Sequence, residues 1–266
     1  MPLWTLFGLR QGKASTAWPA PGSDDGQRAV LGMPRLHVER CQPECAECVA
    51  ACPTGAIAAK RHGVELDYGR CIHCQLCVDA CPSGAMERSS DWAYGVRSRA
   101  DLITGSASSN LDREMHAVQA GIRRVFGRSL HVRHVDAGSC NGCESELQAL
   151  NNPFYNLHRL GIFFTPSPRF ADLLLVTGPV TLAMKAALLA TYEQMPQPRW
   201  VMATGTCAVS GGVAEDGYAC GHGLDGVLPV DIWLPGCPPN PAAFIHALLL
   251  LLERQPQRVH GGHHER

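Results

Sequence analysis

The chain has 266 residues, of which 45% are hydrophobic and 18% are charged, so it can bury the core of one large domain or of two ordinary ones. Its formal net charge of −1 provides no basic excess for nucleic-acid binding. Thirteen cysteines are far more than inert packing needs, and an odd number of them does not fit a complete disulfide framework.

The N-terminal region is expected to be an extended arm. Residues 1–36 are rich in proline, glycine and small polar residues and show little periodicity. Within them, the apolar stretch LWTLFGL (residues 3–9) forms either a docking turn or part of a disordered terminus. The arm lacks the long apolar core and the small-residue cleavage site of a secretory signal.

The apolar stretches of the chain are short. The longest one, Ala242 to Leu252, cannot cross a bilayer. We therefore expect a cytoplasmic protein. In that compartment disulfides rarely persist, and clustered cysteines more often hold metal or perform redox chemistry.

An internal repeat follows the arm. The stretches CVAACPTGAI (residues 48–57) and CVDACPSGAM (residues 77–86) align without a gap, which marks a small two-fold unit. In the second half, Cys71 begins the run C-x2-C-x2-C-x3-C-P, the bacterial ferredoxin pattern, whose fourth cysteine binds the neighbouring cluster. A tight loop wraps three thiolates around three corners of a cubane, and Pro82 ends the local helix so that Cys81 points away.

The first half of the repeat has one extra residue between Cys41 and Cys45. This residue leaves open whether the first cluster is a regular cubane or a three-iron form. We place a small α+β ferredoxin-like domain with two [4Fe-4S] clusters at residues 37–92. A pair of zinc ribbons is the alternative, but zinc ribbons favour two separated CxxC knuckles. The crossed rule predicts two ligand sets: Cys41, Cys45, Cys48 and Cys81 for one cluster, and Cys71, Cys74, Cys77 and Cys52 for the other.

Residues 93–129 are predicted to form a linker and an amphipathic helix. The linker is rich in serine, and after it apolar residues recur at helical spacing from Leu111 to Phe126. At the other end of the chain, residues 255–266 are rich in histidine and are expected to be a flexible tail.

Residues 130–254 alternate between strand and helix patterns, which predicts a mainly parallel, doubly wound, flavodoxin-like α/β sheet. Sites in such sheets lie in loops beyond the carboxyl ends of the strands. Cysteines 140, 143, 207 and 237 all occupy such loops. The expected strands lie within residues 130–138, 171–180, 199–208 and 229–241, and the expected helices within 144–161, 181–195 and 241–254.

The four cysteines of these loops are predicted to form a third metal site. A structural zinc site with four cysteines is one alternative. A thioredoxin-like switch is another, but it needs neither Cys207 nor Cys237. The thirteenth cysteine, Cys220, is expected to be a free thiol. We expect Glu144 and Glu146 to stabilise a helix start and His73 to be a solvated loop residue, and we see no GxGxxG nucleotide fingerprint.

Three phrases carry a family resemblance: DLLLVTGPVT, TGTCAVSGG and LPVDIWLPGCPPNP. With them, residues 131–253 resemble the small subunit of energy-converting (group 4, formate-hydrogenlyase-type) [NiFe]-hydrogenases and, more distantly, the matching 20 kDa subunit of complex I. The resemblance implies that Cys140, Cys143, Cys207 and Cys237 hold a [4Fe-4S] cluster near a large subunit. Complex I has adjacent cysteines at the first position, whereas this chain has Cys-Asn-Gly-Cys, which favours the hydrogenase branch.

The stretch GKASTAWPAP, together with the two-cluster repeat that follows it, resembles the ferredoxin-like subunit that accompanies the small subunit in formate hydrogenlyase complexes. We interpret the chain as a fusion of two redox subunits with three [4Fe-4S] clusters and no catalytic residue of its own. The implied partners are a large [NiFe]-hydrogenase-like (complex I 49 kDa-like) subunit, membrane-arm subunits, and a formate dehydrogenase or ferredoxin donor. The implied reaction is 2H⁺ + 2e⁻ ⇌ H₂ at the inner face of the cytoplasmic membrane. A complex I-like quinone or ferredoxin oxidoreductase module and a stand-alone electron carrier remain alternatives.

Overall fold

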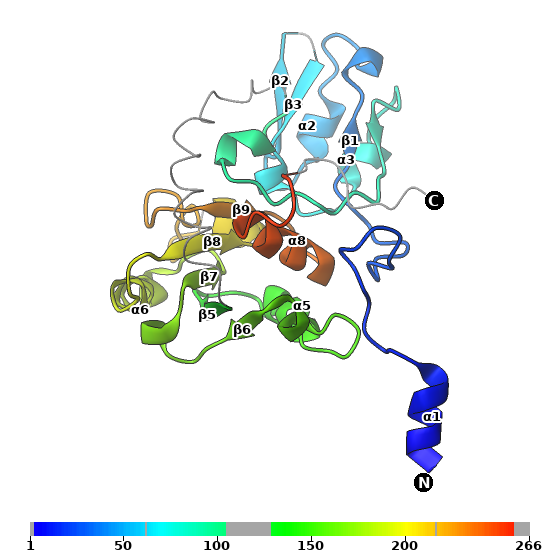
Figure 1. The fold of residues 1–266 in the computed structure, drawn as a ribbon. Coiled ribbons are helices and arrows are strands. Elements are labelled where there is room, and N and C mark those ends of the chain that lie inside the picture. Colours follow the sequence, from blue (N-terminus) through cyan, green and yellow to red (C-terminus); the bar gives the residue numbers. More distant parts are fainter. Residues whose placement is uncertain (1–2, 62, 105–128, 216, 258–266) are drawn as a thin grey trace.

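The N-terminal segment differs from the expected extended arm over its first turns. The computed structural model describes residues 3–61, 63–104, 129–215 and 217–257, and in it Leu3–Gln11 forms the helix α1, which projects from the body (Figure 1). The rest of the arm is irregular but well packed. The ring of Trp18 is buried and lies edge-on to Trp92, with 5.6 Å between the ring centroids. The arm therefore contributes to the core beyond residue 11.

The cysteine repeat folds into a unit with internal two-fold order. Each half runs through a short strand, a 3-10 helix, a short α-helix and a second strand. Strand β1 pairs antiparallel with β4, and β2 pairs antiparallel with β3. The first half contains β1 (Arg35–Leu36), η1 (Val38–Arg40), α2 (Glu47–Ala51) and β2 (Ile57–Lys60). The second contains β3 (Gly63–Leu66), η2 (Tyr68–Arg70), α3 (Leu76–Asp79) and β4 (Met86–Glu87).

A short extended segment connects this unit to the rest of the chain. Val96 pairs antiparallel with Trp233, and the two backbone hydrogen bonds between them measure 2.9 and 2.8 Å. The 3-10 helix η3 (Arg99–Leu102) follows. The amphipathic helix expected between Leu111 and Phe126 and most of the expected tail lie outside the described residues.

The C-terminal part contains one sheet of five parallel strands in the order β6-β5-β7-β8-β9. Numbered within this domain, the order is 2-1-3-4-5, so the predicted flavodoxin-like fold class is confirmed. Strand β6 was not expected. The strands are β5 (Leu130–Asp136), β6 (Ile162–Phe164), β7 (Leu173–Thr177), β8 (Trp200–Thr204) and β9 (Ile232–Leu234).

Helices cover both faces of this sheet. Figure 1 shows α5 and α8 together on one side and α6 on the other. The helix expected over residues 144–161 is shorter than predicted. It ends at Ala149, since Asn151, Asn152 and Pro153 break it, and a 3-10 helix η4 (Leu157–Leu160) forms before Gly161. The α-helices are α5 (Gly142–Ala149), α6 (Leu182–Glu193), the unexpected one-turn α7 (Thr206–Ser210) and α8 (Pro241–Leu251).

Alternating residues of the strands separate the core into two layers. In β7, Leu173 and Leu175 pack on the side of α8, whereas Leu174 and Val176 pack on the side of α6. The second layer continues without a break into the buried residues of the ferredoxin-like unit, among them Tyr68. The two units therefore share one core. Within the described ranges, every helix is too short or too polar to traverse a lipid bilayer.

Candidate metal centres

Two hollows in the ferredoxin-like unit are each lined by four cysteines. In both hollows, three thiols come from one half of the repeat and the fourth comes from the other half. The exchange occurs because a Cys-Pro pair closely follows each short helix and turns the last cysteine away from its own loop. Site A is lined by Cys41, Cys45, Cys48 and Cys81. Site B is lined by Cys52, Cys71, Cys74 and Cys77.

The exchanged cysteines are held by backbone amides. The amide of Ala56 donates to Cys52 Sγ over 3.3 Å, and the amide of Met86 donates to Cys81 Sγ over 3.5 Å. Burial alone raises the pKa of Cys81, but the hydrogen bonds from Met86 and Ser83 outweigh it, so the net shift is downward. Hydrogen bonds of this kind favour the thiolate, which is the form that binds iron.

Two of the four cysteines of site B, Cys71 and Cys77, are buried. Burial raises the pKa of both Cys71 and Cys77 to about 12. A buried thiolate is costly unless a cation neutralises it, so this set suits a cationic iron core. His73, expected to be a solvated loop residue, instead has its Nε2 buried with no hydrogen-bond partner in the described part of the chain. Burial lowers the pKa of His73 to about 4, so its ring is neutral.

Site C lies at the carboxyl ends of the parallel strands. Cys140 lies in the loop after β5 and Cys143 in the first turn of α5. Cys207 lies in α7, directly after β8, and Cys237 follows β9. The chain passes from β5 to β6 on one side and to β7 on the other, so the first loop sits at the switch point of the sheet. The thiols of Cys140 and Cys237 belong to exposed residues.

The four thiols of site C lie close enough to affect one another's charge. Burial raises the pKa of Cys143, and the Glu144 carboxylate adds to the rise. Burial also raises the pKa of Cys207 to about 11. The thiols of Cys140 and Cys237 also raise the pKa of both Cys143 and Cys207.

Gly205 allows β8 to approach this set. Its φ is +84°, and a Cβ built on it lies only 2.6 Å from Cys143 Sγ. A side chain at this position would push into the thiol, so glycine is required by both the backbone and the space. None of the thirteen cysteines forms a disulfide, and Cys220 lines neither site A nor site B.

Sequence reasoning missed a polar cluster beside Cys143. The carboxylate of Glu144 accepts a 2.7 Å hydrogen bond from Ser139 Oγ and a second one from Thr177 Oγ1. His134 Nε2 lies 3.5 Å from Glu144 Oε1 and 2.9 Å from Thr177 Oγ1. Glu144 is thus a buried acceptor of side-chain hydrogen bonds, although it also lies in the first turn of α5 as expected.

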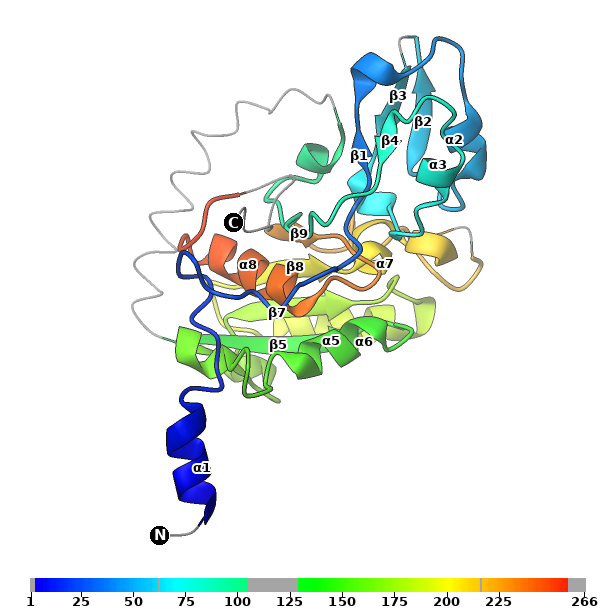
Figure 2. The ribbon, with the colours of Figure 1, turned by 90° about the vertical axis from the view of Figure 1, so that its right-hand side faces the viewer.

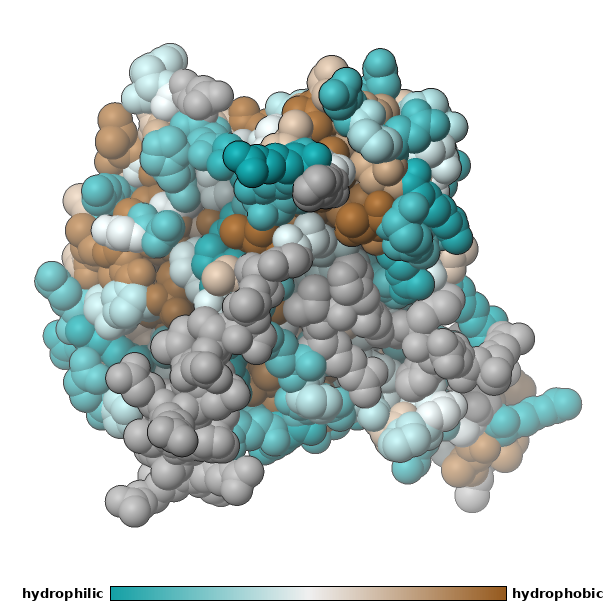
Figure 3. Space-filling model, turned by 90° about the horizontal axis from the view of Figure 1, so that it is seen from above, coloured by the Kyte–Doolittle hydropathy of each residue, from teal (hydrophilic) through white to brown (hydrophobic). Residues whose placement is uncertain are grey.

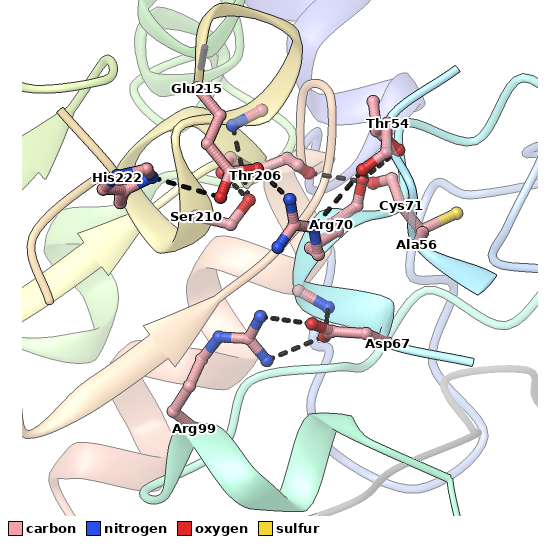
Figure 4. A network of polar contacts seen from close by, with 12 residues as sticks. Thr54, Ala56, Asp67, Arg70, Cys71, Arg99, Thr206, Ser210, Glu215 and His222 are labelled. Carbon is pink, nitrogen blue, oxygen red and sulfur yellow. Dashed lines mark hydrogen bonds and ion pairs between the residues drawn. The ribbon is translucent and has the colours of Figure 1, made fainter. Parts of the chain in front are cut away.

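A second group that sequence reasoning missed joins sites B and C (Figure 4). The Thr206 hydroxyl donates a 2.9 Å hydrogen bond to the carbonyl of Cys71. Arg70 pairs with Glu215, and Arg99 holds Asp67 with two hydrogen bonds of 2.7 and 2.6 Å. No local pattern indicates these contacts, because they join segments that lie far apart in the sequence.

Fold, cysteine sets and amide-to-sulfur hydrogen bonds define an iron–sulfur subunit of an oxidoreductase. Residues 140–251 match the family described as NADH ubiquinone oxidoreductase, 20 Kd subunit, and residues 40–85 match the 4Fe-4S dicluster domain. The chain belongs to the first family and carries the dicluster domain ahead of it. The predicted family is thereby confirmed, and so is the presence of iron–sulfur clusters.

Two relatives are informative. The chain is 39% identical over 150 residues to formate hydrogenlyase subunit 7 of Escherichia coli (strain K12), an alignment that covers 56% of this chain and 59% of that subunit. It is 42% identical over 142 residues to the probable membrane-bound hydrogenase subunit mbhJ of Pyrococcus furiosus, which covers 53% of this chain and 85% of the relative. The chain thus spans less than two thirds of the E. coli subunit.

Solved structures of the same kind align more loosely. A chain of the membrane-bound sulfane sulfur reductase, an archaeal respiratory complex, is 35% identical with a TM-score of 0.44, covering 52% of this chain and 73% of that one. A chain of an NAD⁺-reducing [NiFe]-hydrogenase is 21% identical with a TM-score of 0.39, covering 50% and 96%.

Proposed function

We propose that the chain relays electrons one at a time through three [4Fe-4S] clusters. Cys41, Cys45, Cys48 and Cys81 hold the first, Cys71, Cys74, Cys77 and Cys52 the second, and Cys140, Cys143, Cys207 and Cys237 the third. A cubane held by four thiolates carries one electron and makes no bonds to a substrate, so three in one chain form a wire. Three observations support this proposal. Two hollows are each lined by four cysteines, and four more cysteines whose thiols affect one another's charge lie at the carboxyl ends of the strands. In addition, Thr206, the residue before Cys207, donates a hydrogen bond to the carbonyl of Cys71.

The proposed wire runs through two domains. Residues 37–92 form the ferredoxin-like domain and residues 130–254 form the α/β domain, with the arm (1–36), the linker (93–129) and the tail (255–266) outside them. The two exposed thiols of site C support an exit for electrons at the surface, because a cluster there lies close to whatever subunit docks on this edge of the sheet. Figure 3 looks down on the ferredoxin-like end, where hydrophilic and hydrophobic residues are interspersed.

The partner that receives these electrons is, in our proposal, the large subunit of a [NiFe]-hydrogenase-like complex. The names of the two relatives, a formate hydrogenlyase subunit and a membrane-bound hydrogenase subunit, support it. The reaction served is 2H⁺ + 2e⁻ ⇌ H₂. The other proposed partners are membrane-arm subunits and a formate dehydrogenase or ferredoxin donor, which together hold the chain at the inner face of the cytoplasmic membrane.

The match to the 20 Kd subunit family favours a second candidate, a complex I-like module in which the large subunit has lost its nickel ligands. The large subunit encoded nearby distinguishes the two, because two CxxC pairs are needed to hold nickel. Hydrogen-dependent dye reduction by the purified complex supports the hydrogenase, and activity with quinone or ferredoxin alone supports the module.

Iron analysis tests the wire itself. Anaerobically purified chain is expected to contain about twelve irons and as many acid-labile sulfides, four for each cubane. Low-temperature EPR of the reduced chain is expected to show three distinct cubane signals. A content near eight irons, or stoichiometric zinc, contradicts the proposal.

A further inference from the structure

The side chain of Thr206 lies where the loops of sites B and C meet. Its Oγ1 donates to the carbonyl of Cys71 over 2.9 Å and accepts from the amide of Gly236 over 3.2 Å. Its own amide donates to the carbonyl of Gly236 over 2.9 Å. Thr206 is 1% exposed, so no water competes for these bonds.

These bonds connect three metal-binding loops through one hydroxyl. Cys71 belongs to site B, Cys207 is the next residue after Thr206, and Cys237 is the next residue after Gly236. Figure 2 shows α7 directly beneath the ferredoxin-like unit, and Figure 4 shows Thr206 pointing from α7 towards Cys71. From Cys71 Sγ to Cys207 Sγ, the path follows covalent bonds except for the single hydrogen bond of Thr206.

We propose that Thr206 is a positioning residue that couples sites B and C for electron transfer. The inference rests on the proposed relay function. In the step concerned, one electron leaves the reduced cluster of site B, which is oxidised by one unit, and enters the oxidised cluster of site C, which is reduced by one unit. No proton and no covalent bond is exchanged, and Thr206 keeps its hydroxyl proton throughout.

The neighbouring contacts hold the Cys71 loop in place around this hydroxyl. Arg70 Nε donates to the carbonyl of Thr54 over 3.3 Å, and Thr54 Oγ1 donates back to the carbonyl of Arg70 over 2.7 Å. The guanidinium of Arg70 also binds Glu215, which directly follows the 3-10 helix that begins at Gly212. The loop is thus fixed from both sides, so removal of the Thr206 hydroxyl changes the coupling while the loop stays in place.

Three variants separate the hydroxyl from the packing. Thr206→Val has nearly the same shape but neither donates nor accepts, and Thr206→Ser keeps the hydroxyl and loses the methyl group. Thr204→Val is the matched control. Thr204 is also fully buried, two residues earlier at the end of β8, and its hydroxyl has no hydrogen-bond partner within the described residues. Its removal therefore alters a buried threonine without cutting a link between sites.

The experiment uses the full chain, purified anaerobically, with iron and sulfide counted first. Photoreduction with an external dye followed by freeze-quench EPR gives the rate at which electrons distribute between sites B and C. The dipolar splitting between the two reduced clusters reports their separation. We expect Thr206→Val to slow the exchange severalfold with unchanged splitting, whereas Thr206→Ser and Thr204→Val exchange at the wild-type rate.

The outcomes are distinct. If electrons exchange between sites B and C as fast in Thr206→Val as in wild type, the inference is wrong. It is also wrong if the dipolar splitting changes together with the exchange rate, because the residue then acts only through the distance between the clusters. If Thr206→Val does not retain its iron, Thr206→Ser decides: wild-type exchange supports the inference and slow exchange overturns it. A wild-type chain with too few irons or too few cubane signals contradicts the relay function instead.

Discussion

Arg70 and Glu215 form an ion pair across the boundary between the ferredoxin-like unit and the α/β domain, 145 positions apart in the chain. Each lies near a cysteine of a candidate metal site, since Arg70 precedes Cys71 and Glu215 follows the helix α7 that carries Cys207. The Glu215 carboxylate also lies 3.2 Å from His222 Nδ1. This pair fastens the two units at the point where sites B and C approach.

Replacing Arg70 with alanine is expected to loosen this boundary. The pair is only partly exposed, with 34% and 17% of the two side chains accessible. Its loss should therefore lower the free energy of unfolding by about 1–2 kcal/mol, between the values for surface and buried pairs. Urea unfolding of the iron-loaded chain measures the change.

The control for this change is Arg88→Ala, which breaks an exposed pair with Asp79. Those two side chains are 61% and 60% accessible, so we expect a change of less than about 0.5 kcal/mol. Equal effects of the two substitutions would show that the boundary pair does not fasten the units.

Gly205→Ala is expected to empty site C and spare the ferredoxin-like sites. The added methyl group meets Cys143 Sγ at 2.6 Å. Iron content should fall by about four atoms, one cubane, and one EPR signal should vanish. Gly161→Ala serves as a control, because Gly161 has a similar φ of +78° but open space around it. If both variants lose the same iron, backbone strain and not the thiol contact is responsible.

Cysteine replacements test the exchange of the fourth ligand between the two halves. Cys81→Ser should remove the signal of site A, although Cys81 lies in the same sequence run as three cysteines of site B. Conversely, Cys52→Ser should remove the signal of site B. EPR of each variant identifies the lost cluster by comparison with Cys48→Ser and Cys77→Ser. Cys220→Ser should lose no iron. Loss of the site B signal in Cys81→Ser and of the site A signal in Cys52→Ser would contradict the assignment.

His134 should make the fold sensitive to mild acid. Burial lowers the pKa of His134, and this effect outweighs the opposing influence of the Glu144 and Asp136 carboxylates. The folded chain therefore binds the proton less tightly than the unfolded chain, in which the pKa is about 6.5. Stability should fall as the pH drops below that value.

His134→Gln keeps a hydrogen-bonding group near Thr177 but does not titrate. Comparison of urea midpoints between pH 5 and 8 should show a flatter profile for this variant than for wild type. A wild-type profile at least as flat as that of the variant would contradict the assignment of His134.

Much of the architecture could be predicted from local patterns. The alternation of apolar strands and helices from residue 130 onward is a local property, and so is the spacing of Cys71, Cys74 and Cys77. The early end of α5 was missed because an apolar helix pattern continues across Pro153, and the short strand β6 directly after that pattern was missed as well. The bond between Thr206 and Cys71 has no sequence signature at all, since it arises only when two units dock.

The exchange of Cys52 and Cys81 between the halves also constrains biosynthesis. A nascent chain that has left the ribosome only as far as Lys60 contains three cysteines of site A and one cysteine of site B. Neither set of four is then complete. The second half of the repeat completes both sets of cysteines. Translation of Cys77 completes site B, and translation of Cys81 then completes site A. In the proposed ligand arrangement, metal insertion therefore waits until almost the whole repeat has been translated.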